Sequence, residues 1–153
     1  MSVRLSEDEA WEVLGSSHTG ILTTLRRDGF PVALPVWFVA EDHTILVAGP
    51  AVTKKFSRVR HDRRASFLVE SGYRWAELQA VQITGAAELV DQPDWEHMDA
   101  LLDAKYKGAR TPREEMAPSA RARYDSARAL IRIVPEGRIL SWDNARLDPN
   151  RGR

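Results

Sequence analysis

The chain has 153 residues, of which 43% are hydrophobic and 29% charged, a composition typical of an ordinary folded domain rather than a disordered chain. Its 22 basic and 22 acidic side chains cancel, so the chain as a whole has no electrostatic preference for nucleic acid, and any anion site has to come from local clustering. The absence of cysteine excludes disulfides, thiolate metal sites and a cysteine nucleophile.

The sequence also contains no recognisable metal-binding motif and no membrane-spanning segment. The four histidines show no HxH or HExxH spacing, so we expect no metal. No run approaches 18 apolar residues, and the N-terminal residues do not read as a signal peptide. We therefore expect a cytoplasmic protein without a membrane span, folded as a single domain over residues 1–153.

The first 17 residues predict one short amphipathic helix. Ser6 and Glu9 form an S-x-x-E capping box, which satisfies two backbone N–H groups at a helix start. Apolar side chains follow at helical spacing, beginning with Ala10 and Trp11.

The next segment predicts a β-hairpin. Residues 19–25 are β-branched and apolar, and the Asp28-Gly29 pair is a strong hairpin signal. The partner strand is residues 31–39. Pro35 lies inside that strand and has no N–H to donate, so it predicts either a bulge or an unpaired edge.

The middle of the chain predicts strands on both sides of a short helix. Residues 44–48 form a strand that Gly49-Pro50 should end. A helix fits residues 54–61, with Thr53 as its N-cap. Two further strands fit residues 65–69 and 80–90.

A helical insert is predicted over residues 92–128. Pro93 suits a first-turn position, and a second helix is expected from Pro112 to about Arg128. The first helix carries an apolar stripe, which we interpret as core or dimer packing rather than a cofactor site: Trp95, Met98, Leu101, Leu102 and Tyr106.

The chain closes with two strands, residues 130–134 and 138–142, and a polar tail over residues 144–153. Antiparallel strands joined by hairpin-length links favour a mainly β barrel of six to seven strands with short peripheral helices. No GxGxxG follows a strand, so the fingerprint of a Rossmann fold is missing.

The most informative stretch is residues 53–64, in which six of twelve side chains are Lys or Arg. If Thr53 caps a helix, then Lys54, Lys55 and Arg58 lie on its first turns, beside free N–H groups and the positive end of the helix dipole. A phosphate binds to that combination of donors and cations. The alternative is a solvated basic surface, because charge runs usually face water.

In order and spacing, three motifs resemble the pyridoxamine-5′-phosphate-oxidase-like split-barrel superfamily, over about residues 19–142. They are T-G-I-L-T-T-L-R-R-D-G-x-P, T-K-K-F-S-R-V-R-H-D-R-R-A-S-F-L-V and V-x-I-x-G-x-A-E-L. The branch that the chain resembles most is the actinobacterial one that uses the deazaflavin coenzyme F-420. This resemblance implies an antiparallel split β-barrel that works as a homodimer, with its coenzyme between the subunits.

The resemblance also implies roles for individual residues. Lys55 would bind the coenzyme phosphate, helped by Thr53 and Lys54. The remaining coenzyme contacts in the same subunit would come from Pro35, Val36, Trp37, Val47, Ala48, Gly49, Phe56 and Arg58. The partner subunit would contribute Tyr73, Arg74, Trp75, Gln79 and Trp142.

By the same resemblance, the chain would transfer hydride from reduced F-420 to an unsaturated small organic molecule. No catalytic side chain is then required, because the coenzyme ring carries the hydride. One alternative is an FMN-dependent oxidase or reductase, and another is a non-catalytic protein that binds flavin, deazaflavin or haem. Pyridoxamine-phosphate oxidase itself has an Arg-Gln pair where this chain has Gln79-Ala80, so its vitamin chemistry is not expected here.

Overall fold

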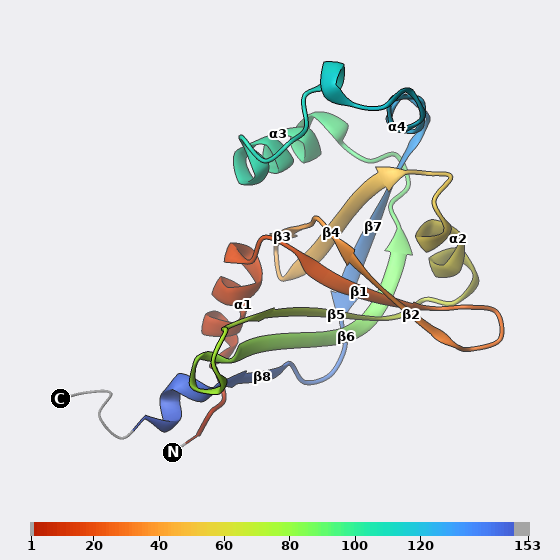
Figure 1. The fold of residues 1–153 in the computed structure, drawn as a ribbon. Helices are drawn as coiled ribbons and strands as arrows, with labels where there is room; N and C mark the ends of the chain where they lie inside the picture. The colour runs from red at the N-terminus through yellow and green to blue at the C-terminus, as the bar shows by residue number, and fades with distance from the viewer. Residues whose placement is uncertain (1, 149–153) are drawn as a thin grey trace.

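The structure, a computed structural model, describes residues 2–148, and its elements follow the predicted order of helices and strands (Figure 1). The strands are β1 (Gly20–Leu25), β2 (Pro31–Val36), β3 (Val39–Glu41), β4 (Thr44–Pro50), β5 (Arg64–Ser71), β6 (Gln79–Leu89), β7 (Arg128–Pro135) and β8 (Leu140–Asp143). The α-helices are α1 (Glu7–Ser16), α2 (Lys54–His61), α3 (Trp95–Tyr106) and α4 (Pro118–Tyr124). Three short 3-10 helices are η1 (Trp75–Glu77), η2 (Arg113–Glu115) and η3 (Asn144–Leu147).

One antiparallel sheet holds all of these strands in the order β2-β1-β5-β6-β7-β4-β3, with β8 pairing beside β6. Strands β2 and β3 lie at opposite ends of that order, yet only Trp37 and Phe38 separate them in sequence. The three Cα–Cα steps from Val36 to Val39 reach roughly 11 Å at most, so the sheet has to curl until its two ends approach each other. This short link explains why the sheet forms a half-barrel. The observed sheet confirms the predicted mainly β split-barrel class.

The edge strand β2 explains how its two prolines are tolerated. The Arg26 N–H donates to the Phe30 carbonyl, which makes these two residues a hydrogen-bonded pair. Because such pairs alternate in an antiparallel ladder, Pro31, Ala33 and Pro35 fall at positions whose backbone groups point away from β1. Of the two predicted alternatives for Pro35, the structure shows the unpaired edge and no bulge.

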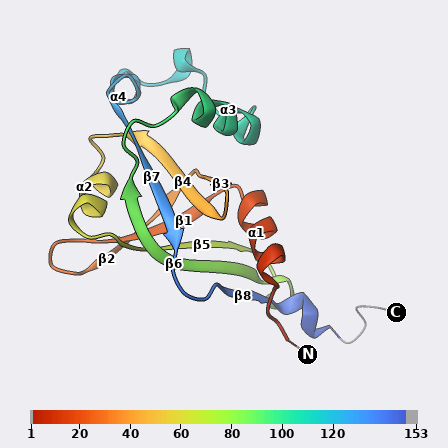
Figure 2. The same ribbon diagram turned by 180° about the vertical axis from the view of Figure 1, so that it is seen from behind.

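Strand β6 bends because it changes partner along its length. Its first four residues pair with β8 and its last five with β7, while β5 follows its other side (Figure 2). Gly85 lies where β7 begins to pair. A methyl group there would lie 2.0 Å from the Val134 carbonyl oxygen, so only glycine fits this approach of two backbones.

Two groups of buried side chains fill the molecule. The larger lies inside the barrel, where Phe38, Phe67 and Ile133 meet α1 and α2. The smaller lies under α3 and contains Met98 and Leu130. The apolar stripe of α3 therefore packs the core of its own chain.

Several predicted boundaries are wrong. Residues 31–39 form two strands rather than one, which gives eight strands instead of six or seven. The strand β4 was expected to end before Gly49, but it includes both Gly49 and Pro50. Pro50 is its last residue, where a missing N–H costs little. Pro93 lies outside α3, because the Asp94 carboxylate accepts the His97 N–H at 3.0 Å as the N-cap.

The second helix of the insert is also shorter than predicted. Residues 112–128 contain η2, α4 and the first residue of β7. The break comes at Pro118, which forces Ala117 into an extended conformation with ψ of 147° and starts a new helix. The predicted tail begins with η3, whose Asn144 N–H donates to the Leu78 carbonyl, and residues 149–153 lie outside the described part.

Within residues 2–148, no helix has both the length and the apolar character needed to cross a membrane.

Candidate functional site

The first turn of α2 brings together groups that bind phosphate. Thr53 is the N-cap residue, but its hydroxyl donates to the Pro50 carbonyl at 3.0 Å instead of accepting a helix N–H. The Lys55 ammonium donates to that hydroxyl oxygen at 3.2 Å. The backbone N–H groups of Lys54 and Lys55 find no acceptor among the described residues. Free N–H groups, a hydroxyl and two lysines therefore share one helix start.

Lys55 is half-buried against the end of β4. A methyl group on Gly49 would lie 3.2 Å from the Lys55 Nζ, so the bare backbone of Gly49 makes room for the ammonium. Burial, with the nearby charge of Arg58, lowers the pKa of Lys55. No carboxylate in the part of the chain that the structure describes forms an ion pair with it. A bound anion would offset the desolvation of this ammonium.

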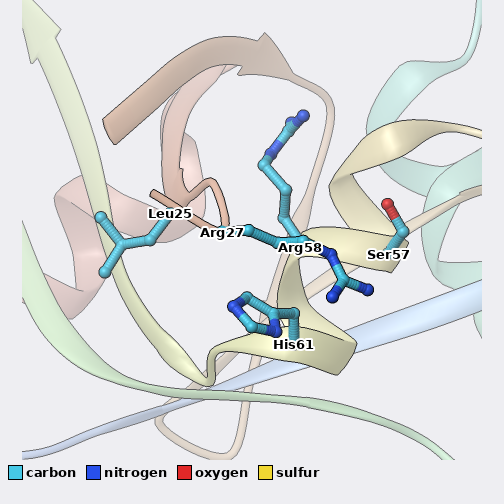
Figure 3. Close-up of a pocket in the computed structure, with 5 residues that line it drawn as sticks. All are labelled: Leu25, Arg27, Ser57, Arg58 and His61. Carbon is cyan, nitrogen blue, oxygen red and sulfur yellow. The ribbon is translucent and has the colours of Figure 1, made fainter. Parts of the chain in front are cut away.

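A shallow pocket of about 80 Å³ opens on the following turn of α2, beside the β1–β2 turn (Figure 3). Its lining residues are Leu25, Arg27, Ser57, Arg58 and His61. Arg58 is fixed by a 2.8 Å hydrogen bond from its Nε to the buried hydroxyl of Thr24, and burial lowers its pKa. Neither Arg27 nor Arg58 has a carboxylate partner within residues 2–148. Since a water molecule occupies about 30 Å³, the pocket has room for a small anionic group.

Most other residues expected around this phosphate site are buried in the core, although the Phe56 ring centroid lies 4.9 Å from the Lys55 Nζ. The side chains of Val47 and Phe56 are fully buried inside the barrel. Ala48 faces the opposite side of β4 and packs with the group under α3. Of the predicted β4 residues, the structure therefore brings only Gly49 to Lys55.

The predicted ring-binding strand ends at a corner of the sheet. Pro35 and Val36 are the last two positions of β2, and the backbone carbonyl of Pro35 points away from β1. Trp37 follows outside the strand and keeps 38% of its surface exposed. A planar ligand at this edge would meet free backbone groups and one accessible aromatic side chain.

Sequence reasoning missed the side chains that support this corner. The Tyr106 ring stacks on Trp37 with centroids 4.2 Å apart and planes within 4°. The His18 ring contacts both of them edge-on. Tyr106 belongs to the helical stripe that the sequence analysis interpreted as packing, and no local pattern predicts its contact with a residue 69 positions away.

The residues assigned to a partner subunit lie elsewhere in the fold. Tyr73, Arg74 and Trp75 occupy the β5–β6 loop, beside β8 and at the other end of the sheet from α2 (Figure 1). Tyr73 is 99% exposed and Trp75 is 70% exposed. Gln79 and Trp142 are half-buried on the paired strands β6 and β8. Within one chain these five residues do not join the group at α2.

A sequence profile of the family described as pyridoxamine 5'-phosphate oxidase matches residues 6–140. The chain belongs to this family. The match spans every element from α1 to the start of β8, including the start of α2 and the corner at Trp37. No curated protein matches the chain.

Solved structures share the fold. A conserved hypothetical protein from Mycobacterium tuberculosis is 31% identical, with a TM-score of 0.78, over 95% of this chain and 89% of that one. A FAD-binding protein from Mesorhizobium loti is 23% identical, with a TM-score of 0.67, over 92% and 96% of the two chains. A heme binding protein from Mycobacterium smegmatis is 20% identical, with a TM-score of 0.65, over 94% of this chain and 60% of that one. At 23% and 20% identity, the last two structures show only that the fold is shared.

Proposed function

We propose that the chain is an oxidoreductase that transfers hydride from reduced coenzyme F-420 to an unsaturated small organic substrate, as a homodimer with coenzyme sites between the subunits. The observation that carries the proposal is the first turn of α2. There the half-buried Lys55 ammonium, the Thr53 hydroxyl and two free N–H groups converge without a carboxylate partner in the described chain. Membership of the pyridoxamine 5'-phosphate oxidase family supports a flavin-type coenzyme, and this turn has the donors that the coenzyme phosphate needs.

The protein's own residues would bind, orient and shield the coenzyme. Lys55 and the N–H groups of α2 hold the phosphate, and the edge of β2 with Trp37 lies against the ring. The coenzyme, once bound, supplies the hydride from its ring. Rate enhancement then comes from holding that ring against the substrate and excluding water, which needs no acidic or basic side chain at the reacting atoms.

The pocket at Arg27 and Arg58 favours F-420 over FMN. F-420 carries carboxylates beyond its phosphate, whereas FMN ends at the phosphate. Two arginines without carboxylate partners in the described chain, one turn of α2 beyond Lys55, provide a complementary site for that additional negative charge.

Two alternative functions have their own support. The first is a flavin-dependent oxidase or reductase and the second a non-catalytic binding protein; the proteins that share this fold include one named as FAD-binding and one named as heme binding. The absorbance of the purified protein separates them, because a bound flavin absorbs blue light, haem gives a Soret band, and a coenzyme that dissociates leaves the protein colourless.

The test is a titration of the protein with F-420 and with FMN, followed by ring fluorescence. Lys55→Met retains most of the aliphatic stem and removes the charge, so we expect the dissociation constant for F-420 to rise about 10- to 100-fold, the range for one charge-assisted hydrogen bond. Arg60→Ala is the matched control, because Arg60 is an exposed cation on the same helix. It should change the dissociation constant by less than about twofold.

The outcomes separate the hypotheses. Tighter binding of FMN than of F-420 would replace the first hypothesis by the second. Binding of neither coenzyme would exclude both enzymes. Equal affinity in the wild type and in Lys55→Met would show that the phosphate binds elsewhere.

A further inference from the structure

The corner between β2 and β3 is held by a side chain from the helical insert. Tyr106, the last residue of α3, is fully buried. Its hydroxyl accepts a hydrogen bond from the Phe38 N–H at 2.9 Å. The same hydroxyl donates to the His18 carbonyl at 2.8 Å, with the Phe38 carbonyl at 3.0 Å. One phenol thus fastens the corner to the loop before β1.

The backbone N–H and carbonyl of Phe38 have no partner in either strand and depend on the Tyr106 hydroxyl. Phe38 lies between two strands that pair with different partners, so neither ladder supplies a donor or acceptor for it. Phe38 is fully buried, and an unpaired backbone group there would be costly. Tyr106 substitutes for the missing strand and fixes the direction in which the chain turns.

The orientation of Trp37 follows from the same contact. The Tyr106 ring covers one face of the indole in a parallel stack, and the His18 ring covers part of its edge. The 38% of Trp37 that stays exposed therefore belongs to the remaining face and edge. Trp37 directly follows Val36, the last residue of the edge strand β2, whose outward backbone groups have no neighbouring strand in the described part of the chain.

We propose that Tyr106 is a positioning residue, which sets the orientation of Trp37 so that the exposed indole face stacks on the planar ring of the coenzyme. The inference rests on the proposed function for the identity of that ring. It gives the helical insert a role in the site, although α3 is separate in sequence from the phosphate-binding helix α2.

The test separates binding of the ring from binding of the phosphate. The probes are F-420 and its deazariboflavin core, which lacks the phosphate, together with FMN and riboflavin as the corresponding flavin pair. The variant is Tyr106→Leu, which removes both the stacking ring and the hydroxyl. We expect it to weaken each coenzyme and its phosphate-free core by the same factor, about two- to tenfold, the range for one lost aromatic contact.

Three other variants make the result specific. Lys55→Met should weaken F-420 and leave the core unaffected. Met98→Ala, a buried change on the same helix that does not touch Trp37, should lower the thermal midpoint and leave both dissociation constants unchanged. Tyr106→Phe keeps the stacked ring but removes the hydroxyl that holds the corner, so it should weaken binding less than Tyr106→Leu does.

A second readout needs no coenzyme. Collisional quenching of Trp37 fluorescence, obtained as the difference between each protein and its Trp37→Phe derivative, should increase in Tyr106→Leu but not in Met98→Ala. Unchanged quenching would overturn the positioning role, whether or not a coenzyme binds. Equal affinity of wild type and Tyr106→Leu for the phosphate-free core would overturn it as well, whereas failure of the wild type to bind any ring would overturn only the proposed function.

Discussion

Lys105 has a side-chain ammonium group that is buried, whereas the ammonium group of a lysine usually lies in water. Its Nζ is buried over the Phe38 ring, 3.6 Å from the ring centroid, and no hydrogen-bond partner reaches it among the described residues. Burial lowers the pKa of Lys105 from 10.5 to about 8. The ring face attracts the charged form, but loss of water around the ammonium has the larger effect.

This pKa predicts how stability changes with pH. Between about pH 8 and pH 10.5 the unfolded chain holds the Lys105 proton while the folded chain has released it. Since the unfolded state then binds more protons, the free energy of unfolding should rise with pH across this window. Urea unfolding of the wild type and of Lys105→Met checks this, because the variant should lose that part of the rise. An identical pH dependence in both proteins would show that the amine is solvated.

The sequence identified some residues of the candidate site and missed others for a physical reason. Thr53 to Lys55 were found because a helix start, its cap and its cations are adjacent in the chain. Val47 and Phe56 were instead assigned through the family resemblance, and their side chains are buried in the core because of the strand and helix faces on which they lie. Tyr106 and His18 reach Trp37 from distant segments, and such contacts follow from tertiary packing alone.

At the scale of elements, the bend of β6 depends on Gly85. A methyl group there would approach the Val134 carbonyl oxygen and carbon to 2.0 and 2.9 Å, and both atoms belong to the paired strand β7. The change Gly85→Ala should therefore reduce the free energy of unfolding by about 1–3 kcal/mol, the usual cost of overpacking. Chemical unfolding followed by circular dichroism measures it.

Gly15 provides the matched control for this prediction. It lies in α1 with nothing within 4 Å of the position of a new methyl group. Gly15→Ala should stabilise the protein by up to about 1 kcal/mol, because alanine favours a helix. If both variants were equally stable, the crossing of β6 and β7 would not need glycine.

Most elements were predictable because each is encoded locally. The capping box at Ser6 and Glu9 and the turn at Asp28-Gly29 both appear in the structure as predicted. The errors lie where the structure of a segment depends on which other strands pair with it. The split of residues 31–39 arises because β2 and β3 pair with strands at opposite ends of the sheet, and no property of those nine residues alone reveals it.

At the scale of the whole molecule, the residues proposed for the coenzyme site lie in distant parts of one chain. The cationic turn of α2 and the exposed aromatic residues Tyr73 and Trp75 occupy different ends of the sheet (Figure 1). A two-fold dimer can bring one end of each chain against the other end of its partner. Light scattering should accordingly give a particle of twice the 17.3 kDa chain mass.

Mixing two defective variants tests whether subunits share the site. Lys55→Met lacks the phosphate contact, and the double change Tyr73→Ser with Trp75→Ser lacks the aromatic loop; each alone should bind F-420 weakly. A mixed dimer would combine an intact Lys55 with the intact loop of its partner at one of its two sites. Random exchange of equal amounts makes about half of the dimers mixed, each with one intact site of two, so titration of the mixture should recover about a quarter of all binding sites. No recovery would mean that each loop serves its own chain.

The two prolines of β2 limit how such a dimer is built. Along the outward side of this strand, Pro31 and Pro35 offer no N–H, and only Ala33 between them can donate. A strand from another molecule needs a row of alternating donors to add to an edge, so this edge is a poor template for sheet extension. We therefore expect β2 not to recruit a strand from another molecule, although it has no neighbour on its outer side in the described part of the chain.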